Sequence, residues 1–224
     1  IKAIILGDSH ADAIASSITS ILNLSKDGVI YAARSGCPYI LNARFNEDIS
    51  FCTKINEDRH QYLKQHKNTP IFIVNRYLER MEGENNIDRD NSQIIYFSDK
   101  KSTKKEKYLE FQDNFEKSIC DISPISPVYI VSTIPEMGIN IPPLMAKQMM
   151  TLNKILDNSI SYSQYQNRSS QMNKLLEDVA QKCNAKILAP SKILCQQGKC
   201  ISEYKGRSIY RDGDHLSEYG NKLL

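Results

Sequence analysis

A serine stands where a buried strand of the sequence gives way to a helix, and this position suits a nucleophile. Residues 1–6 form an Ile-rich apolar run that ends in a Gly-Asp-Ser-His motif at residues 7–10, as expected of a buried strand. Apolar residues then recur at helical spacing through residues 11–22. Ser9 is therefore predicted beside a helix N-terminus, where free backbone N–H groups favour an oxyanion. The simpler interpretation is that Asp8 or Ser9 only caps the helix.

A second motif near the other end of the chain supplies the remaining groups that a serine nucleophile needs. Asp212 precedes His215 by three residues, again just before a short helical pattern. In a Ser–His–Asp site the imidazole takes the hydroxyl proton, and the carboxylate fixes its tautomer. One turn that carries Asp212 and His215 would provide both roles. Asp–His pairs alone are common, but their combination with a strand-end Gly-Asp-Ser is much more specific.

Together the two motifs resemble those of the SGNH (GDSL-like) hydrolase family. Its first block, Gly-Asp-Ser, is matched at residues 7–9, and its last block, Asp-x-x-His, is matched at residues 212–215. Asp214 does not fit the family spacing, so we assign the acid role to Asp212. The sequence is more similar still to the SGNH domains fused to acyltransferase family 3 membrane proteins. The stretches that carry this likeness are residues 34–38, residues 134–138, Cys195 with Cys200, and residues 210–220.

The resemblance implies roles for individual residues. Ser9, His215 and Asp212 would form a catalytic triad, and the backbone N–H groups of Ser9 and Gly36 would form an oxyanion hole. From spacing alone, Gly36 is equally well explained as a turn glycine before Pro38. Glycine also permits the close backbone approach that an oxyanion donor needs.

The third oxyanion donor of the family is matched only in part. Free-standing members read Gly-x-Asn-Asp at the end of the third strand, whereas this chain has Asn75 without the glycine or the second acid. Asn75 donates to the oxyanion, or Arg76 binds substrate here instead, because a guanidinium offers fixed donors. We also expect Glu136, after the fourth strand, to line the pocket and contact substrate. A second acid and a buried loop contact are the alternatives for Glu136.

Apolar runs alternate with helical patterns along the chain, which predicts an α/β fold. The five runs are residues 1–6, 28–33, 70–74, 128–132 and 186–189. Alternation of this kind favours a parallel sheet with helices on both faces. We expect a three-layer α/β/α sandwich with a five-stranded parallel sheet and a single domain over residues 1–224. The site residues would gather at the carboxyl ends of the strands. Residues 78–102 are expected to form a surface segment, and the Met-rich residues 144–156 a helix or a lid.

Six cysteines among 224 residues are more than a reducing cytosol usually favours. Six cysteines allow 15 pairings, and the positions of the cysteines around short stretches and at helix ends favour one of them. The predicted disulfides are Cys37–Cys52, Cys120–Cys183 and Cys195–Cys200. A zinc site is the competing explanation, but the chain has no Cys-x-x-Cys, and His60 and His66 lie six residues apart. We therefore expect no metal site.

Charge and hydropathy set further bounds on function. The net charge of +3 is small and mixed, so we expect no nucleic-acid partner. No apolar run approaches the roughly 18 residues that cross a bilayer. Oxidised cysteines in a chain without a signal sequence indicate a domain cut from a larger exported or membrane-bound protein.

The resemblance implies a biological setting. A transmembrane acyltransferase domain, fused or adjacent, would move acetyl groups outward from cytoplasmic acetyl-CoA. This domain would lie in the periplasm as part of an inner-membrane protein and would hold no cofactor of its own. It would pass acetyl through a Ser9 ester to hydroxyls of a surface polysaccharide such as O-antigen, capsule or peptidoglycan. The alternatives are a carbohydrate esterase or deacetylase of the same fold, and a non-catalytic glycan-binding module with a relic triad.

Overall fold

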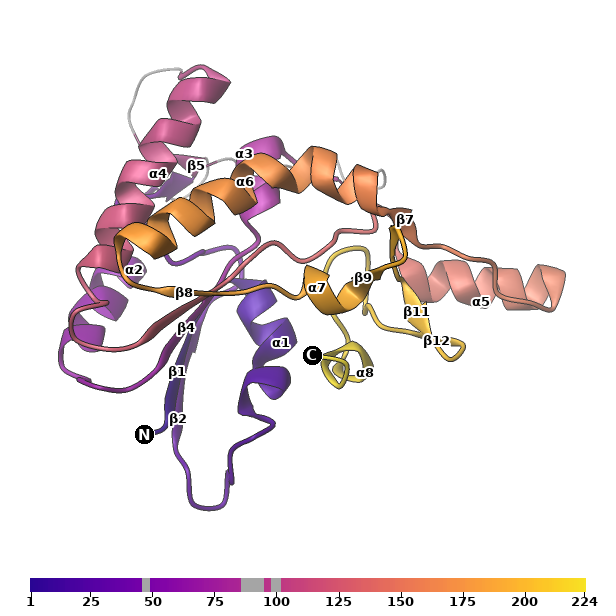
Figure 1. Ribbon diagram of the computed structural model, residues 1–224, viewed down its shortest axis with the longest axis horizontal. Coiled ribbons are helices and arrows are strands. Elements are labelled where there is room, and N and C mark those ends of the chain that lie inside the picture. Colours follow the sequence, from indigo (N-terminus) through magenta and orange to yellow (C-terminus); the bar gives the residue numbers. More distant parts are fainter. Residues whose placement is uncertain (46–48, 86–94, 98–101) are drawn as a thin grey trace.

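A five-stranded parallel sheet forms the centre of the protein (Figure 1). The computed structural model describes residues 1–45, 49–85, 95–97 and 102–224. The strands follow the order β2-β1-β4-β6-β8, and each neighbouring pair is parallel. Their bounds are β1 (Ala3–Gly7), β2 (Val29–Ala33), β4 (Ile71–Val74), β6 (Val128–Val131) and β8 (Lys186–Leu188). Each predicted apolar run is a strand, and the predicted fold class is confirmed.

Helices cover both faces of this sheet because successive side chains of a strand point to opposite sides. Ile4 on β1 packs in one hydrophobic cluster with Phe115 and Leu176, whereas the adjacent Ile5 packs in another cluster with Ile14. In Figure 1, α4 and α6 lie on one side of the sheet, and α1 and α8 lie on the other. These helices are α1 (Ser9–Thr19), α4 (Lys104–Cys120), α6 (Tyr162–Lys182) and α8 (Glu218–Asn221).

The remaining elements surround this sandwich. The helices are α2 (Ile49–Lys64), α3 (Tyr77–Glu82), α5 (Ile141–Leu152) and α7 (Ser191–Leu194). Short strand pairs add β3 (Arg44–Phe45) with β5 (Ile95–Tyr96), β7 (Ile160–Ser161) and β9 (Cys195–Gln196) with β10 (Lys199–Cys200), and β11 (Glu203–Tyr204) with β12 (Arg207–Ser208). The Met-rich stretch expected as a helix or a lid is helical, as α5. Much of the expected surface segment over residues 78–102 lies outside the described residues.

The three predicted disulfides are confirmed. Cys37–Cys52 ties the loop after β2 to α2, and Cys120–Cys183 joins the ends of α4 and α6. Cys195–Cys200 closes the β9–β10 hairpin. Among the described residues, no helix combines the length and apolar character needed to cross a bilayer.

The order of the strands determines where a site can form. The chain runs from β1 to β2 on one side and then returns to β4 on the other side of β1. Ligand sites of open α/β sheets lie at such a reversal, beyond the carboxyl ends of the strands. Ser9 follows β1 and Asn75 follows β4, so both residues lie at this point of the sheet.

Candidate active site

The backbone around Gly7 places Ser9 at the carboxyl end of β1, an inner strand of the sheet. Gly7 has a φ of +144°, and a Cβ there would lie 1.7 Å from the carbonyl oxygen of Val74. Only glycine tolerates such a close approach of two strands. Asp8 is the N-cap of α1, and its Oδ1 accepts a hydrogen bond of 2.9 Å from the backbone N–H of His10. Asp8 is thus the capping residue, while Ser9 is the first residue of the helix and carries a half-buried side chain.

The two ends of the chain meet at His215. Its Nε2 lies 2.7 Å from the Oγ of Ser9, a residue 206 positions away in the sequence. Its Nδ1 lies 2.8 Å from Oδ2 of Asp212. The other carboxylate oxygen of Asp212 accepts backbone N–H bonds from Asp214 and His215, which fixes the turn. The structure therefore brings the three residues of the predicted triad into one hydrogen-bonded row, which we call the triad.

The electrostatics of the triad favour a charged imidazole. Burial lowers the pKa of His215, but hydrogen bonds and negative charge from Asp212 and Asp214 outweigh it and raise the pKa to about 9. Burial alone would raise the pKa of Asp212, yet its bonds to His215 and to two backbone N–H groups hold that pKa below its usual value. The raised pKa favours the imidazolium form beside the carboxylate, and the ring must lose a proton before Nε2 can accept one from Ser9.

The loop after β2, which contains Gly36, starts beside the end of β1. The N–H of Arg34 donates to the carbonyl of Gly7 over 3.0 Å, so this loop starts directly beside β1. Gly36 has a φ of +77°, a conformation that glycine adopts readily. Arg59 donates to the carbonyl of Cys37 and to that of Gly7, and so links the two segments. The predicted turn is confirmed, because the N–H of Cys37 donates to the carbonyl of Arg34, and the role of Gly36 in oxyanion binding stays a prediction.

Asn75 holds the same loop from the other side. Its Oδ1 accepts from the N–H of Tyr39 at 2.9 Å, and its Nδ2 donates to the carbonyl of Tyr39 at 3.3 Å. The buried side-chain amide thus bonds to both the N–H and the carbonyl of Tyr39, as the backbone of a neighbouring β-strand would. A role for Asn75 in oxyanion binding stays a prediction.

Asp214, which the family spacing set aside, lies at the centre of the site. Its Oδ1 is 2.7 Å from His215 Nδ1 and 3.3 Å from His10 Nε2. Its Oδ2 is 3.0 Å from the guanidinium of Arg76. Burial would raise the pKa of Asp214, but His10, His215 and Arg76 hold that pKa well below its usual range. Sequence reasoning set Asp214 aside and did not single out His10, because their contacts depend on the turn and on the packing of α1 and β4 around it.

Arg76 is surrounded by acidic side chains rather than open to solvent. It forms ion pairs with Glu79, Glu84, Glu136 and Asp214, and we call these five residues the ion cluster. The Arg76 N–H also donates to Asp8 Oδ2 over 2.8 Å, which ties the cluster to the N-terminus of α1. Arg76 and Glu136, both expected to bind substrate, are buried and paired with each other. Their contact with a substrate stays a prediction.

Comparison with known proteins places this chain in a family. The family profile described as "SGNH domain (fused to AT3 domains)" matches residues 1–224. The chain belongs to that family. No curated protein sequence matches the chain. Among solved structures, the periplasmic domain of a lipopolysaccharide acetyltransferase from Salmonella ser. Paratyphi A is similar, with a TM-score of 0.71 and 14% sequence identity. The match covers 99% of this chain and 79% of that one, and it shows a shared fold.

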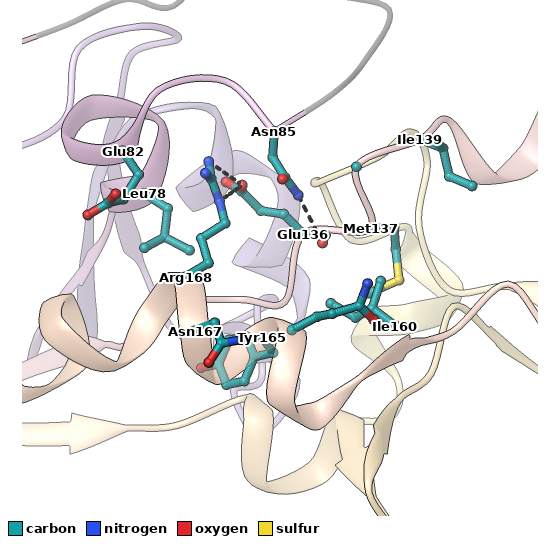
Figure 2. A pocket seen from close by; sticks show the side chains of 12 residues that line it. Leu78, Glu82, Asn85, Glu136, Met137, Ile139, Ile160, Tyr165, Asn167 and Arg168 are labelled. Carbon is teal, nitrogen blue, oxygen red and sulfur yellow. Dashed lines mark hydrogen bonds and ion pairs between the residues drawn. The ribbon is translucent and has the colours of Figure 1, made fainter.

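A cavity of about 580 Å³ opens beside the ion cluster of this SGNH domain. Figure 2 shows Arg168 of α6 reaching toward Glu136, and the Arg168 Nε lies 3.1 Å from Glu136 Oε2. Asn85 donates to the carbonyl oxygen of Glu136, and Tyr165 lies on the α6 side (Figure 2). The wall is linked to the turn that carries Asp212 and His215, because the N–H of Met137 donates to the carbonyl of Gly213 over 2.7 Å, although the triad residues are not among those that line the cavity. Cavities of roughly 300–1,000 Å³ are typical of ligand sites.

One group of residues could also hold a metal ion. His10, Asp214 and His215 are buried, and their ligand atoms lie within 4.8 Å of one another. Arg76 lies 3.0 Å from Asp214, and its positive charge opposes a cation at this position. His215 Nε2 is already within 2.7 Å of Ser9 Oγ. The chemistry of the donor set therefore fits a hydrogen-bonded cluster better than a metal site, and the expectation of no metal stays a prediction.

Proposed function

We propose that this SGNH domain is a serine O-acetyltransferase that passes acetyl groups to hydroxyls of a bacterial surface polysaccharide. The observation that carries the proposal is the row Ser9–His215–Asp212, with contacts of 2.7 Å and 2.8 Å between residues from opposite ends of the chain. Such a row provides a nucleophile, a base and a group that orients the base. A relic site in a pure binding module has no need of this geometry.

In the first half-reaction Ser9 becomes acetylated. The neutral imidazole of His215 takes the Ser9 hydroxyl proton at Nε2 while Oγ bonds to the acetyl carbonyl carbon. The bond from acetyl to its donor then breaks, and His215 returns the proton to the leaving atom. Asp212 keeps Nδ1 protonated and stabilises the cation that forms between these steps.

In the second half-reaction the acetyl ester is transferred. His215 takes a proton from a sugar hydroxyl, whose oxygen bonds to the acetyl carbon, and Ser9 Oγ leaves with the proton from His215. Both tetrahedral intermediates carry an oxyanion. We assign its stabilisation to the backbone N–H groups of Ser9, at the N-terminus of α1, and of Gly36. Removal of one such donor typically raises the barrier by roughly 3–4 kcal/mol.

The family supports the setting of this reaction. Its members are fused to AT3 domains, which we propose as the transmembrane partner that supplies acetyl from cytoplasmic acetyl-CoA. The similar Salmonella structure is a periplasmic domain, and the three disulfides of this chain suit an oxidising compartment. We therefore propose a periplasmic location. No bound cofactor is needed for acetyl transfer through serine.

The cavity beside Glu136 supports a saccharide as acceptor. Amide, carboxylate, guanidinium and phenol groups line it together with Leu78 and Met137. A saccharide site needs both polar and apolar groups, because sugar rings combine hydroxyls with apolar C–H faces. A polysaccharide segment in this cavity would contact Arg168 and Asn167, which lie on α6 away from the triad. Glu136 would contact the saccharide from the cavity wall, and Arg76 would act on it through the ion pair with Glu136.

Covalent labelling tests the nucleophile. A fluorophosphonate probe should label the wild-type chain at Ser9, and Ser9→Ala should abolish labelling and turnover of p-nitrophenyl acetate. Ser20→Ala is a matched control, because Ser20 is an exposed serine of the same helical segment that bonds to Ser17. Labelling of Ser9→Ala at the wild-type rate would overturn the serine mechanism.

Product analysis separates transfer from hydrolysis. Acetyl-Ser9 enzyme formed from p-nitrophenyl acetate is supplied with de-O-acetylated lipopolysaccharide or with buffer alone. A transferase should place acetyl esters on the polysaccharide and turn over faster in its presence. Release of free acetate at one rate under both conditions would favour the esterase instead.

A further inference from the structure

Two carboxylates lie within contact distance of the same ring nitrogen of His215. Nδ1 lies 2.8 Å from Asp212 Oδ2 and 2.7 Å from Asp214 Oδ1. Asp212 and Asp214 are two residues apart, and the N–H of Asp214 donates to Asp212 Oδ1, so one tight turn presents both carboxylates. A Ser–His–Asp site needs a single acceptor at this nitrogen, and the second acceptor is therefore unexplained by the triad.

Contacts from two other elements hold Asp214 in this position. His10 Nε2, on α1, lies 3.3 Å from Oδ1, and the His10 ring packs at 4.6 Å between centroids against the ring of His215. Arg76, after β4, lies 3.0 Å from Oδ2. Asp214 is 1% exposed, so its charge acts on His215 with little screening by water.

We propose that Asp214, positioned by His10 and Arg76, is a second acceptor for the His215 imidazole N–H, so that a pair of carboxylates supports the base. This inference rests on the proposed serine mechanism and adds a positioning residue to it. His10 and Arg76 keep the Asp214 carboxylate charged and directed at Nδ1. Asp212 then shares the stabilisation of the imidazolium cation instead of providing all of it.

The charged groups around His215 come from several elements. Asp212 and Asp214 face it from its own turn, His10 and the Ser9 hydroxyl face it from α1, and Arg76 reaches it through Asp214. Glu136 and Glu79 adjoin Arg76 rather than His215. Removal of the Asp214 carboxylate should therefore lower the stability of the protonated His215 ring, whereas removal of the Glu79 carboxylate should not.

Asp214 should affect the rate in opposite ways at alkaline and at neutral pH. A high proton affinity makes His215 a stronger base when its ring is neutral, but it leaves a smaller fraction of the ring neutral at pH 7. Asp214→Asn should lower the alkaline plateau of kcat/KM about 10-fold or more, because the cation in the transition state loses a charge partner. It should also move the midpoint of the profile to lower pH, so that the loss at pH 7 is smaller than the loss on the plateau.

The experiment measures kcat/KM for p-nitrophenyl acetate from pH 5 to 10.5 in the wild-type chain, in Asp214→Asn and in Glu79→Gln. Titration of the His215 ring by ¹⁵N NMR in a Ser9→Ala background gives the same pKa without any activity. We expect a fall of about one pKa unit or more for Asp214→Asn, a tenfold change in proton affinity. Glu79→Gln is the matched control, since it removes another carboxylate from Arg76, and its His215 should titrate as in wild type.

The outcomes are distinct. A midpoint unchanged in Asp214→Asn, with kcat/KM reduced equally at every pH, would overturn the inference and leave Asp214 a structural residue. If Asp214→Asn does not fold, Asp212→Asn decides by NMR, because Asp214 should still hold the pKa of His215 above its ordinary 6.5. An ordinary value there would overturn the inference. Zinc-dependent activity that EDTA abolishes would assign these residues to a metal and also overturn it. Unchanged activity of Ser9→Ala would instead remove the proposed function.

Discussion

The triad and the ion cluster meet at His215 but are built in opposite ways. Triad side chains are partly open to the site, with Asp212 20% exposed, and they join the two ends of the chain. The ion cluster is closed, with Arg76 6% and Asp214 1% exposed, and it joins the carboxyl ends of β4 and β6 to the catalytic turn. Charges at partly open positions are easily changed without loss of the fold, whereas buried charges that lose a partner are costly. Substitutions in the triad should therefore affect rate, and those in the ion cluster should affect stability, except that Asp214, which also contacts His215, should affect both.

Replacement of Arg76 gives the largest expected effect on stability. Arg76→Met leaves Glu79, Glu84, Glu136 and Asp214 without their shared cation. Loss of one partner from a buried ion pair costs about 3–5 kcal/mol, so the midpoint of urea unfolding should fall strongly. Arg211→Met is the control, because the Arg211–Asp12 pair is exposed and should contribute less than about 1 kcal/mol. Equal losses in the two variants would contradict the contrast between the regions.

Asp212→Asn should give the reverse pattern. Because Asp212 is partly exposed and Asn keeps an acceptor for the backbone N–H groups of the turn, the urea midpoint should change little. kcat/KM for p-nitrophenyl acetate should fall about 100-fold or more, yet less than the roughly 10⁴-fold loss seen when a sole triad carboxylate is lost. A full 10⁴-fold loss would indicate that Asp214 contributes nothing.

At His215, rate and stability should depend on pH in opposite directions. The pKa of His215 is raised to about 9, so its contribution to folding is fully present below pH 6.5 and is lost as the pH rises through 9. That contribution is at most about 3 kcal/mol. Activity depends on the neutral imidazole and should rise over the same interval. Parallel profiles of urea stability and kcat/KM between pH 6.5 and 9 would contradict this assignment.

Asn75 lies at the boundary between the two regions and gives the smallest expected effect. Asn75→Ala removes both bonds to the Tyr39 backbone, which should cost about 1–3 kcal/mol of stability. The loop that carries Gly36 then loosens, and kcat/KM should fall about 10-fold. A loss of 100-fold or more with an unchanged urea midpoint would instead assign Asn75 to the oxyanion hole.

The sequence was sufficient for features that depend on local pattern. The five apolar runs, the strand-to-helix position of Ser9, and the three-residue spacing of Asp212 and His215 each follow from short stretches of chain. The disulfides were also predictable, because their cysteines flank one loop or end neighbouring helices. Most of these features are decided by residues near one another in sequence or by a family motif, whereas Cys120–Cys183 spans 63 residues and depends on two helices packing together.

Only the tertiary structure decided how the polar groups at the site are paired. Asp214 adjoins His215 in sequence, but its contact with Nδ1 depends on the turn, and its contact with Arg76 depends on β4 lying beside β1. Arg76 and Glu136 looked available to substrate, and the ends of β4 and β6 bring them together in a buried pair instead. Buried charges must find partners wherever packing places them, and that choice is made by contacts between segments far apart in the chain.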